Sequence, residues 1–270
     1  MSRIPKVLHH VWMSNNPFKE KFHGFRCSWM RYNPDWNFLF HTIDNMRYDG
    51  LPKKCIEGIK HPVLHYTAKS DIARWCILWL YGGVYVDTDV ECLANFDEFM
   101  DNEMFAGISY EPNGIGNAVV GAVPKHRLSY AIMMAITEAC LKDVRATNKN
   151  IVDMTVNLSG KMLVKCPKIY PRDYFYPIKW DLTERTEKFI TNPKEMFPKS
   201  YTIHHWSGVL KDGWTWDTIK TRPMTAVSSV VPVATVASLV QLQPQQTVIT
   251  QPRTPKPLSQ RVSPKELIHA

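Results

Sequence analysis

Gly82-Gly83-Val84-Tyr85-Val86-Asp87-Thr88-Asp89-Val90 joins a glycine pair to an apolar run and two carboxylates. A glycine pair is typical of the end of a helix, and a short apolar run after it is typical of a buried strand. Because side chains alternate across a strand, we expect Asp87 and Asp89 to point to the same side where this strand ends. Two carboxylates so close together are hard to keep ionised unless a cation lies between them. The stretch therefore predicts a helix, a buried strand and a cation site.

The predicted cation at Asp87 and Asp89 is Mn²⁺ or Mg²⁺, because carboxylate oxygens are hard ligands that suit both ions. Such ions usually keep some water and complete their shell with phosphate oxygens of a substrate. The pair thus indicates metal-assisted chemistry on a phosphorylated substrate. A plainer interpretation is a solvated turn, since Asp-x-Asp is common by chance. The glycine pair and the apolar run before it favour the metal.

Predicted strands and helices alternate through residues 1–216. The strongest helix prediction spans residues 67–81, whose apolar face ends at the glycine pair. Two more helices are predicted at residues 22–32 and 127–141, and residues 169–178 form an irregular aromatic stretch. Strands are predicted at residues 6–12, 36–41, 84–87, 105–109, 118–123 and 200–206. This alternation indicates an α/β domain with a mostly parallel central sheet, in which ligands bind at the carboxyl ends of the strands.

Residues 217–270 differ in composition from the domain before them. They are rich in Pro, Gln and Val and contain no aromatic residue after Trp216. Such a segment buries little apolar surface, so we expect a flexible C-terminal tail. An added strand or a partner contact is the second interpretation of its Val-rich part.

The net charge of +8 does not indicate nucleic-acid binding. Half of it lies in residues 217–270, which contain six Lys/Arg and two Asp/Glu, and the rest is spread without a basic helix. A diffuse positive charge instead tolerates anionic nucleotides and phosphates.

The six cysteines are scattered and form no Cys-x-x-Cys pair, so we expect buried, reduced thiols. The first residues lack the apolar region of a signal peptide, and no apolar run reaches transmembrane length. The sequence thus predicts a cytoplasmic protein without a transmembrane segment, either free or peripheral to a membrane.

Ser70-Asp71-Ile72-Ala73-Arg74 lies near the start of the helix predicted at residues 67–81. The first turn of a helix has free N–H groups and favours a nearby anion, which suits Ser70 and Asp71. Asp71 and Arg74 are three residues apart and so share a face. The simplest interpretation is a helix cap with a surface ion pair. In the functional interpretation, Arg74 contacts a phosphate or a sugar hydroxyl while Asp71 accepts hydrogen bonds from hydroxyls.

Trp12 and the pair His204-His205 lie at the ends of predicted strands. An indole at the end of the first strand can stack on a flat base, although a tryptophan in the core is the plainer alternative. Neighbouring histidines on a strand face opposite ways, so only one of the two can complete a metal shell begun by Asp89. Packing or surface roles are the alternative for both histidines.

Taken in order, these motifs resemble glycosyltransferase family 32, a group of DXD-containing sugar transferases. The family is related to the yeast α-1,6-mannosyltransferases, to capsular polysaccharide transferases and, more distantly, to the clostridial glucosylating toxins. The resemblance covers about residues 4–208. It rests on Ile4-Pro5-Lys6-Val7-Leu8-His9-His10-Val11-Trp12, Ser70-Asp71-x-x-Arg74 and Tyr81-Gly82-Gly83-Val84-Tyr85-Val86-Asp87-Thr88-Asp89, with support from Asn113-Gly114-Ile115-Gly116-Asn117-Ala118 and His204-His205-Trp206.

This resemblance implies a GT-A fold, which is a Rossmann-like nucleotide-sugar-binding domain. It also implies a UDP- or GDP-sugar donor, a divalent cation that is usually Mn²⁺, and transfer of a hexose with retention of anomeric configuration. The implied acceptor is a glycan, a lipid-linked molecule or a protein, as in polysaccharide biosynthesis.

Roles in donor binding carry over from the family residue by residue. Trp12 is expected to stack on the nucleobase. Asp71 and Arg74, with Ser70 beside them, are expected to hold the donor sugar. The remaining residues expected to line the donor site are Tyr85, Asp87 and Asn117.

Roles in metal binding and catalysis carry over in the same way. Asp89 is expected to bind the metal directly, and Asp87 to meet the ribose or a metal-bound water. His205 is the expected third ligand, with His204 as the alternative. Asp87, Asp89 and Arg74 are the residues expected to carry catalysis, in which the metal neutralises the departing diphosphate.

Two other functions compete with a transferase. A phosphohydrolase of the haloacid-dehalogenase type also places Asp-x-Asp after a buried strand, but it needs that motif on an early strand and a later acidic motif. It leaves Ser70-Asp71-x-x-Arg74 unexplained. The second competitor is a non-catalytic module that binds nucleotide sugars or carbohydrates.

Overall fold

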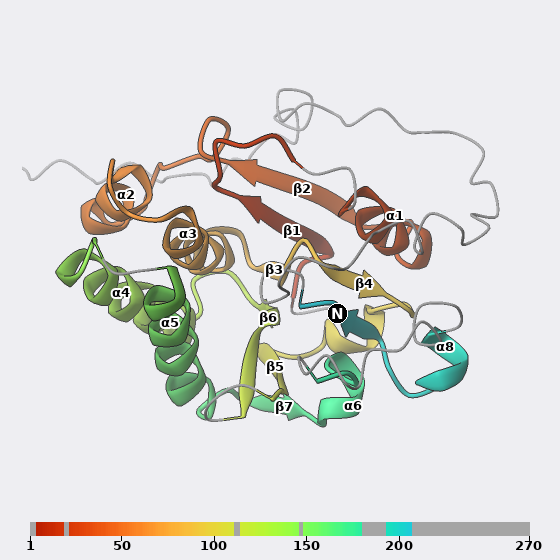
Figure 1. The fold of residues 1–270 in the computed structure, drawn as a ribbon. Coiled ribbons are helices and arrows are strands. Elements are labelled where there is room, and N and C mark those ends of the chain that lie inside the picture. Colours follow the sequence, from red (N-terminus) through yellow and green to blue (C-terminus); the bar gives the residue numbers. More distant parts are fainter. Residues whose placement is uncertain (1–3, 19–21, 111–113, 146–147, 180–192, 207–270) are drawn as a thin grey trace, which may run out of the picture. The chain divides into compact units, whose positions relative to one another are not determined.

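The computed structural model describes residues 4–18, 22–110, 114–145, 148–179 and 193–206 (Figure 1). The tail predicted at residues 217–270, together with the domain boundary before it, lies outside these ranges.

A six-stranded sheet organises the described part of the chain, in the order β2-β1-β3-β6-β5-β7. Strand β1 pairs in parallel with β2 and β3, and β5 pairs in parallel with β7. Only β6 runs against its two neighbours. The strands are β1 (Val7–Trp12), β2 (Asn37–Thr42), β3 (Gly83–Val86), β5 (Met104–Ile108), β6 (Ile115–Ala122) and β7 (Lys168–Tyr170). The predicted α/β class with a mostly parallel sheet is confirmed.

Four helices gather on one side of this sheet (Figure 1). They are α2 (Lys53–Lys60), α3 (Tyr66–Tyr81), α4 (Arg127–Lys142) and α5 (Asn148–Leu163). Helix α3 contacts β1, β3 and β6 as well as the three other helices, which makes it the centre of this layer. Its buried side chains, among them Ile72, Trp75 and Ile77, belong to the larger hydrophobic core.

A second core lies around α1 (His23–Tyr32), where Trp29 packs with residues of β1, β3 and a small two-stranded sheet. That small sheet pairs β4 (Val90–Cys92) with β8 (Thr202–His204) in antiparallel fashion. The remaining short elements are the 3-10 helix η2 (Asp97–Phe99), α6 (Arg172–Phe175) and α8 (Pro193–Met196). Within the residues described, no helix is both long and apolar enough to cross a membrane.

The glycine pair ends α3 and lets β3 enter the sheet. Gly82 and Gly83 have φ angles of 63° and 91°, a left-handed region that side chains with a Cβ rarely adopt. A Cβ at Gly83 would press against the carbonyl oxygen of Val7 and lie 2.9 Å from His9 Nε2. Glycine is therefore needed here both for the turn and for the close approach of β3 to β1.

Most of the predicted elements are confirmed to within a few residues, including the helix at 67–81 and the buried strand after it. The helix begins at Tyr66 with His65 as its cap, whose ring accepts a hydrogen bond from Thr67 N–H. Ser70 and Asp71 therefore lie beyond the first turn, and our expectation that both lie in it was wrong. The sequence patterns also missed α2, α5 and β4, and α5 contributes to the site described next.

Candidate functional site

Asp87 and Asp89 lie in a tight turn between β3 and β4. The turn is closed by a hydrogen bond of 3.1 Å from Val90 N–H to the Asp87 carbonyl oxygen. Strand β3 already ends at Val86, so the two carboxylates are not on one face of a strand as the alternation argument assumed. The turn, and not strand periodicity, brings them together at the carboxyl end of β3.

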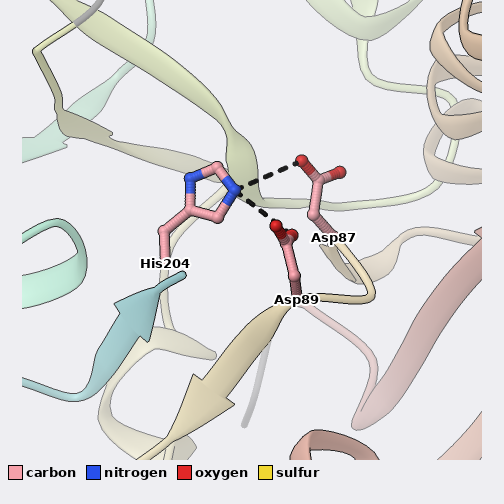
Figure 2. A group of neighbouring side chains, drawn as sticks. All are labelled: Asp87, Asp89 and His204. Atoms are coloured by element: carbon pink, nitrogen blue, oxygen red, sulfur yellow. Dashed lines mark ion pairs between the residues drawn. The ribbon is translucent and has the colours of Figure 1, made fainter. Parts of the chain in front are cut away.

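His204 completes a group with these two carboxylates (Figure 2). Its Nε2 atom lies 3.2 Å from Asp89 Oδ1 and 3.9 Å from Asp87 Oδ2. One ligand atom of each residue lies within 4.8 Å of the other two. We call Asp87, Asp89 and His204 the cation group, because two carboxylates and one imidazole are a donor set that suits a divalent ion such as Mn²⁺.

His204 reaches the cation group through the pairing of β4 with β8, in which Val90 is the partner of His204. Its neighbour His205 faces the other way, with Nε2 3.0 Å from Glu91 Oε2 and its ring stacked on Phe25 at 4.3 Å. The expected opposite orientation of the two histidines is therefore seen. The choice between them is corrected, because the structure places His204 and not His205 beside the aspartates.

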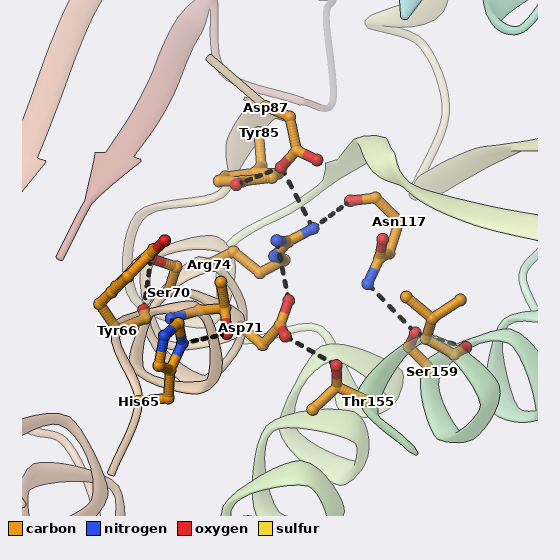
Figure 3. Close-up of polar contacts among 12 residues, drawn as sticks. His65, Tyr66, Ser70, Asp71, Arg74, Tyr85, Asp87, Asn117, Thr155 and Ser159 are labelled. Carbon is orange, nitrogen blue, oxygen red and sulfur yellow. Dashed lines mark hydrogen bonds and ion pairs between the residues drawn. The ribbon is translucent and has the colours of Figure 1, made fainter. Parts of the chain in front are cut away.

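Arg74 connects the cation group to α3 (Figure 3). Its Nη2 lies 2.8 Å from Asp71 Oδ1, and its Nη1 lies 3.3 Å from Asp87 Oδ1. Nη1 also donates a hydrogen bond of 2.9 Å to the Asn117 carbonyl oxygen on β6. The guanidinium lies 4.6 Å from the centre of the Tyr85 ring, a cation–π distance. The Asp71–Arg74 pair is thus a buried ion pair and not the surface pair of the simplest interpretation.

Tyr85 fixes the orientation of Asp87. Its hydroxyl donates a hydrogen bond of 2.6 Å to Asp87 Oδ1, the same oxygen that faces Arg74. Burial raises the pKa of Tyr85 well above its usual value, so the phenol stays protonated and remains a donor. The other oxygen, Oδ2, is then the one that faces His204 and the cation group.

Helix α5 supplies the other side of the Arg74 environment. Thr155 Oγ1 donates a hydrogen bond of 2.7 Å to Asp71 Oδ2, and Asn117 Nδ2 donates one of 3.3 Å to Ser159 Oγ. We call Asp71, Arg74, Tyr85, Asp87, Asn117 and Thr155 the Arg74 cluster, which shares Asp87 with the cation group. Burial raises the pKa of the Asp71 carboxyl, while Arg74 and Thr155 act in the opposite direction.

Sequence reasoning missed Thr155 because it missed α5. The available signal was the spacing of Met154, Leu158 and Met162, which recur every four residues and pack against the larger core. Thr155 and Ser159 have the same spacing on the helix.

Ser70 and Trp12, the other predicted donor residues, lie outside the Arg74 cluster. The Ser70 hydroxyl donates to the Tyr66 carbonyl oxygen within α3, at 2.9 Å. The Trp12 indole N–H donates to the Asn16 carbonyl oxygen at 2.8 Å, and its ring contacts Phe18 and Phe22. Trp12 is half-buried at the end of β1, one strand away from Asp87. Its predicted stacking on a base stays a prediction.

Residues 19–106 match the family described as "Glycosyltransferase sugar-binding region containing DXD motif". The match includes Asp71, Arg74, Asp87 and Asp89, which the structure brings together. This part of the chain is therefore similar to the sugar-binding region of the DXD-containing glycosyltransferases. Assignment to family 32 agrees with this match, and a match of this kind speaks against the phosphohydrolase.

Similar proteins point to the same group of glycosyltransferases. Inositol phosphoceramide mannosyltransferase 1 of Schizosaccharomyces pombe is 32% identical over 134 residues, covering 48% of this chain and 42% of the relative. Mannosyl phosphorylinositol ceramide synthase SUR1 of Saccharomyces cerevisiae is 29% identical over 129 residues, covering 46% and 32%. The chain thus spans less than half the length of these curated relatives.

Among solved structures, the PaToxG glycosyltransferase superimposes with a TM-score of 0.50 at 14% identity. The superposition covers 60% of this chain and 69% of the other. Likeness at this level of identity concerns the fold alone, and together with the mostly parallel sheet it confirms the predicted GT-A fold.

Proposed function

We propose that this chain is a retaining, metal-dependent glycosyltransferase that moves a hexose from a nucleotide-diphosphate sugar to a glycan, lipid or protein acceptor. The observation that carries the proposal is the contact between the cation group and the Arg74 cluster through the shared Asp87. A diphosphate needs positive charge, and a sugar needs hydrogen-bond acceptors and donors. The two groups of residues offer both at the carboxyl ends of the strands, where ligands bind in α/β sheets.

The residues present fit a divalent cation. Asp89 and His204 would bind it directly, and Asp87 Oδ2 would contact it or one of its waters, since Tyr85 and Arg74 already engage Oδ1. Once bound, Mn²⁺ or Mg²⁺ supplies Lewis-acid neutralisation of the charge on the departing diphosphate. The relatives bear on family and fold only, so the proposed metal rests on the donor atoms of the cation group.

The chain's own residues orient the donor. Arg74 provides a fixed positive charge for a phosphate or a sugar hydroxyl, and Asp71 accepts hydrogen bonds from sugar hydroxyls. Tyr85 orients Asp87 through its hydrogen bond to that carboxylate. Asn117 hydrogen-bonds to both Arg74 and Ser159 and so links β6 to α3 and α5. Trp12 is proposed to stack on the nucleobase.

The arrangement of the carboxylates favours a front-face reaction. Both oxygens of Asp71 already contact Arg74 and Thr155, and Asp87 contacts Arg74 and Tyr85, so these groups are anchored as supports. In the proposed reaction the bond from the anomeric carbon to the diphosphate breaks as the acceptor oxygen bonds to the same face. The acceptor proton passes to the leaving diphosphate. Trapping a glycosyl adduct on a protein carboxylate would argue against this route.

The names of the relatives guide the choice of substrates. Two of them are named for mannose and for inositol-containing ceramides, so GDP-mannose and a lipid acceptor are the first candidates to test. A lipid acceptor would also suit a protein that is peripheral to a membrane.

A hydrolysis screen with Mn²⁺ tests the proposal. The donors are UDP-glucose, UDP-galactose, UDP-N-acetylglucosamine and GDP-mannose, and Asp89→Ala is the control. We expect turnover of one donor, lost in Asp89→Ala and on removal of the metal. If the chain neither binds nor turns over any donor of the panel, it is not a transferase for these donors and the proposal is contradicted. If it binds a donor but turns over none with any acceptor, the result supports the non-catalytic module. Unchanged activity of Asp89→Ala contradicts the metal assignment.

A further inference from the structure

One face of α5 touches both residues that flank Arg74 (Figure 3). Thr155 and Ser159 are one helical turn apart, and both are fully buried. Thr155 donates to Asp71, and Ser159 accepts from Asn117, whose carbonyl oxygen in turn accepts from Arg74. Helix α5 therefore contacts the Arg74 cluster from the side opposite the cation group.

We infer that Thr155 is a positioning residue for donor-sugar binding, which acts by holding Asp71 in the orientation that the sugar requires. This role rests on the proposed function, because it assumes that Asp71 and Arg74 bind the donor. Neither the family match, which ends at residue 106, nor the sequence motifs include Thr155.

The burial of Asp71 makes the bond from Thr155 consequential. The Asp71 side chain is 7% exposed, and a buried carboxylate needs its oxygens engaged by donors. Arg74 engages Oδ1 and Thr155 engages Oδ2, so the two contacts fix the plane of the carboxylate. With only one of these contacts, the carboxylate can rotate about its Cβ–Cγ bond.

The loss of Thr155 would also affect Arg74. The guanidinium is shared between Asp71 and Asp87, at 2.8 and 3.3 Å. If Asp71 lost its hydroxyl donor, we expect its freed Oδ2 to turn toward Arg74 and to draw the guanidinium away from Asp87 and from the Asn117 carbonyl. Such a shift displaces a cationic group in the donor site without removing it.

Ser159 makes the weaker of the two contacts from α5. Its hydroxyl donates to the Val156 carbonyl oxygen within the helix and accepts from the neutral Asn117 amide at 3.3 Å. Hydrogen bonds to a charged group are about twice as strong as those between neutral groups. Thr155, bonded to a carboxylate at 2.7 Å, is thus the residue through which α5 acts on the site.

A purely structural role for Thr155 is the alternative, and Thr137 provides a matched control. Thr137 is also fully buried on a helix of the same layer, α4, and its hydroxyl donates to the Met133 carbonyl oxygen at 2.8 Å. Its hydroxyl also donates to Cys55 Sγ on α2 at 3.5 Å. Thr137→Val removes a buried hydroxyl as Thr155→Val does, but not one bonded to Asp71.

The experiment compares two ligands, the nucleotide sugar that the wild-type chain turns over in the donor panel and the corresponding nucleoside diphosphate. Thr155→Val is expected to weaken binding of the nucleotide sugar about tenfold, the effect of losing one hydrogen bond to a charged group. Binding of the nucleoside diphosphate should weaken less, because it lacks the sugar that Asp71 holds. Thr155→Ser, which keeps the hydroxyl, should restore sugar binding, and Thr137→Val should bind both ligands as the wild type does.

A Thr155→Val variant that binds both ligands like Thr137→Val overturns the inference and leaves the proposed function standing. An equal loss of affinity for both ligands in Thr155→Val, which Thr155→Ser does not restore, also overturns the inference and indicates a structural role. If Thr155→Val does not fold, the pair Thr155→Ala and Thr155→Ser makes the same comparison, since these variants differ only in the hydroxyl. A wild-type chain that neither binds nor turns over any donor contradicts the proposed function itself.

Discussion

The cation group and the Arg74 cluster share Asp87 but balance charge in different ways. In the cation group, two carboxylates face one imidazole nitrogen, so negative charge is concentrated at the turn after β3. In the Arg74 cluster, one guanidinium lies between Asp71 and Asp87, so each of these carboxylates has a cationic partner within the protein. The first arrangement suits binding of a cation, and the second keeps the side chains of the donor site in fixed positions. Metal binding and the rigidity of the site should therefore respond to different mutations.

Asp89→Ala is expected to have the largest effect, on activity and not on folding. It removes the carboxylate closest to His204, and the loss of a direct metal ligand should lower kcat/KM about 1,000-fold or more. Steady-state kinetics over a range of Mn²⁺ concentrations measures this effect. The fully exposed Asp49 is the control, since Asp49→Ala should leave kcat/KM unchanged. Normal activity of Asp89→Ala at low Mn²⁺ would show that the cation group does not bind the metal.

Arg74→Met is expected to affect folding as well as activity, because it leaves the buried Asp71 without its counter-ion. Breaking a buried ion pair in this way costs about 3–5 kcal/mol in the free energy of unfolding. Urea denaturation measures the cost. Arg47→Met is the matched control, since the Arg47–Asp49 pair is exposed and should contribute less than about 1 kcal/mol. Equal effects of the two substitutions would mean that the Arg74 cluster does not rigidify the site.

His204→Ala and His205→Ala separate two adjacent histidines with similar burial. We expect His204→Ala to weaken Mn²⁺ binding at least about 10- to 100-fold, since loss of a residue that only supports a metal ligand already has an effect of this size. His205→Ala should leave Mn²⁺ affinity within about twofold, since its ring contacts Glu91 and Phe25. Isothermal titration with Mn²⁺ distinguishes the two, and the reverse result would restore the ligand expected from the sequence.

A further effect, on stability alone, concerns the buried histidines of β1 and β2, which are His9, His10 and His41. Burial lowers the pKa of His10 to about 3 and that of His41 to about 4, and it lowers the pKa of His9 well below the usual 6.5. The folded state therefore keeps these rings neutral, while the unfolded chain takes up protons below pH 6.5. The stability contribution is complete above that pH and falls as the pH drops below it, by up to about 1.4 kcal/mol per pH unit for each histidine.

Urea denaturation at pH 7.5, 6.5 and 5.5 measures this acid sensitivity. We expect the free energy of unfolding to decrease by less between the first two values than between the last two. A flat profile down to pH 5.5 would mean that these rings are already accessible to protons in the folded chain.

Local patterns were sufficient for the centre of the molecule. The apolar face of α3, the glycine pair and the short run Val84–Val86 predicted a helix, its end and a buried strand, and all three are present. These features depend on neighbouring residues only, because helix ends and short buried strands follow from backbone conformation and hydrophobic spacing. The same patterns placed Asp87 and Asp89 at a carboxyl strand end, although the turn that brings them together was not foreseen.

The sequence by itself determined the family motifs, the α/β class and the acidic pair. Only the tertiary structure decided that His204 and not His205 faces the aspartates, because this depends on the pairing of β4 with β8, more than a hundred residues apart along the chain. It likewise decided that Thr155 on α5 donates to Asp71, 84 positions away. Contacts of this kind arise when elements distant in sequence pack around a shared core, so the periodicity of a single segment cannot predict them.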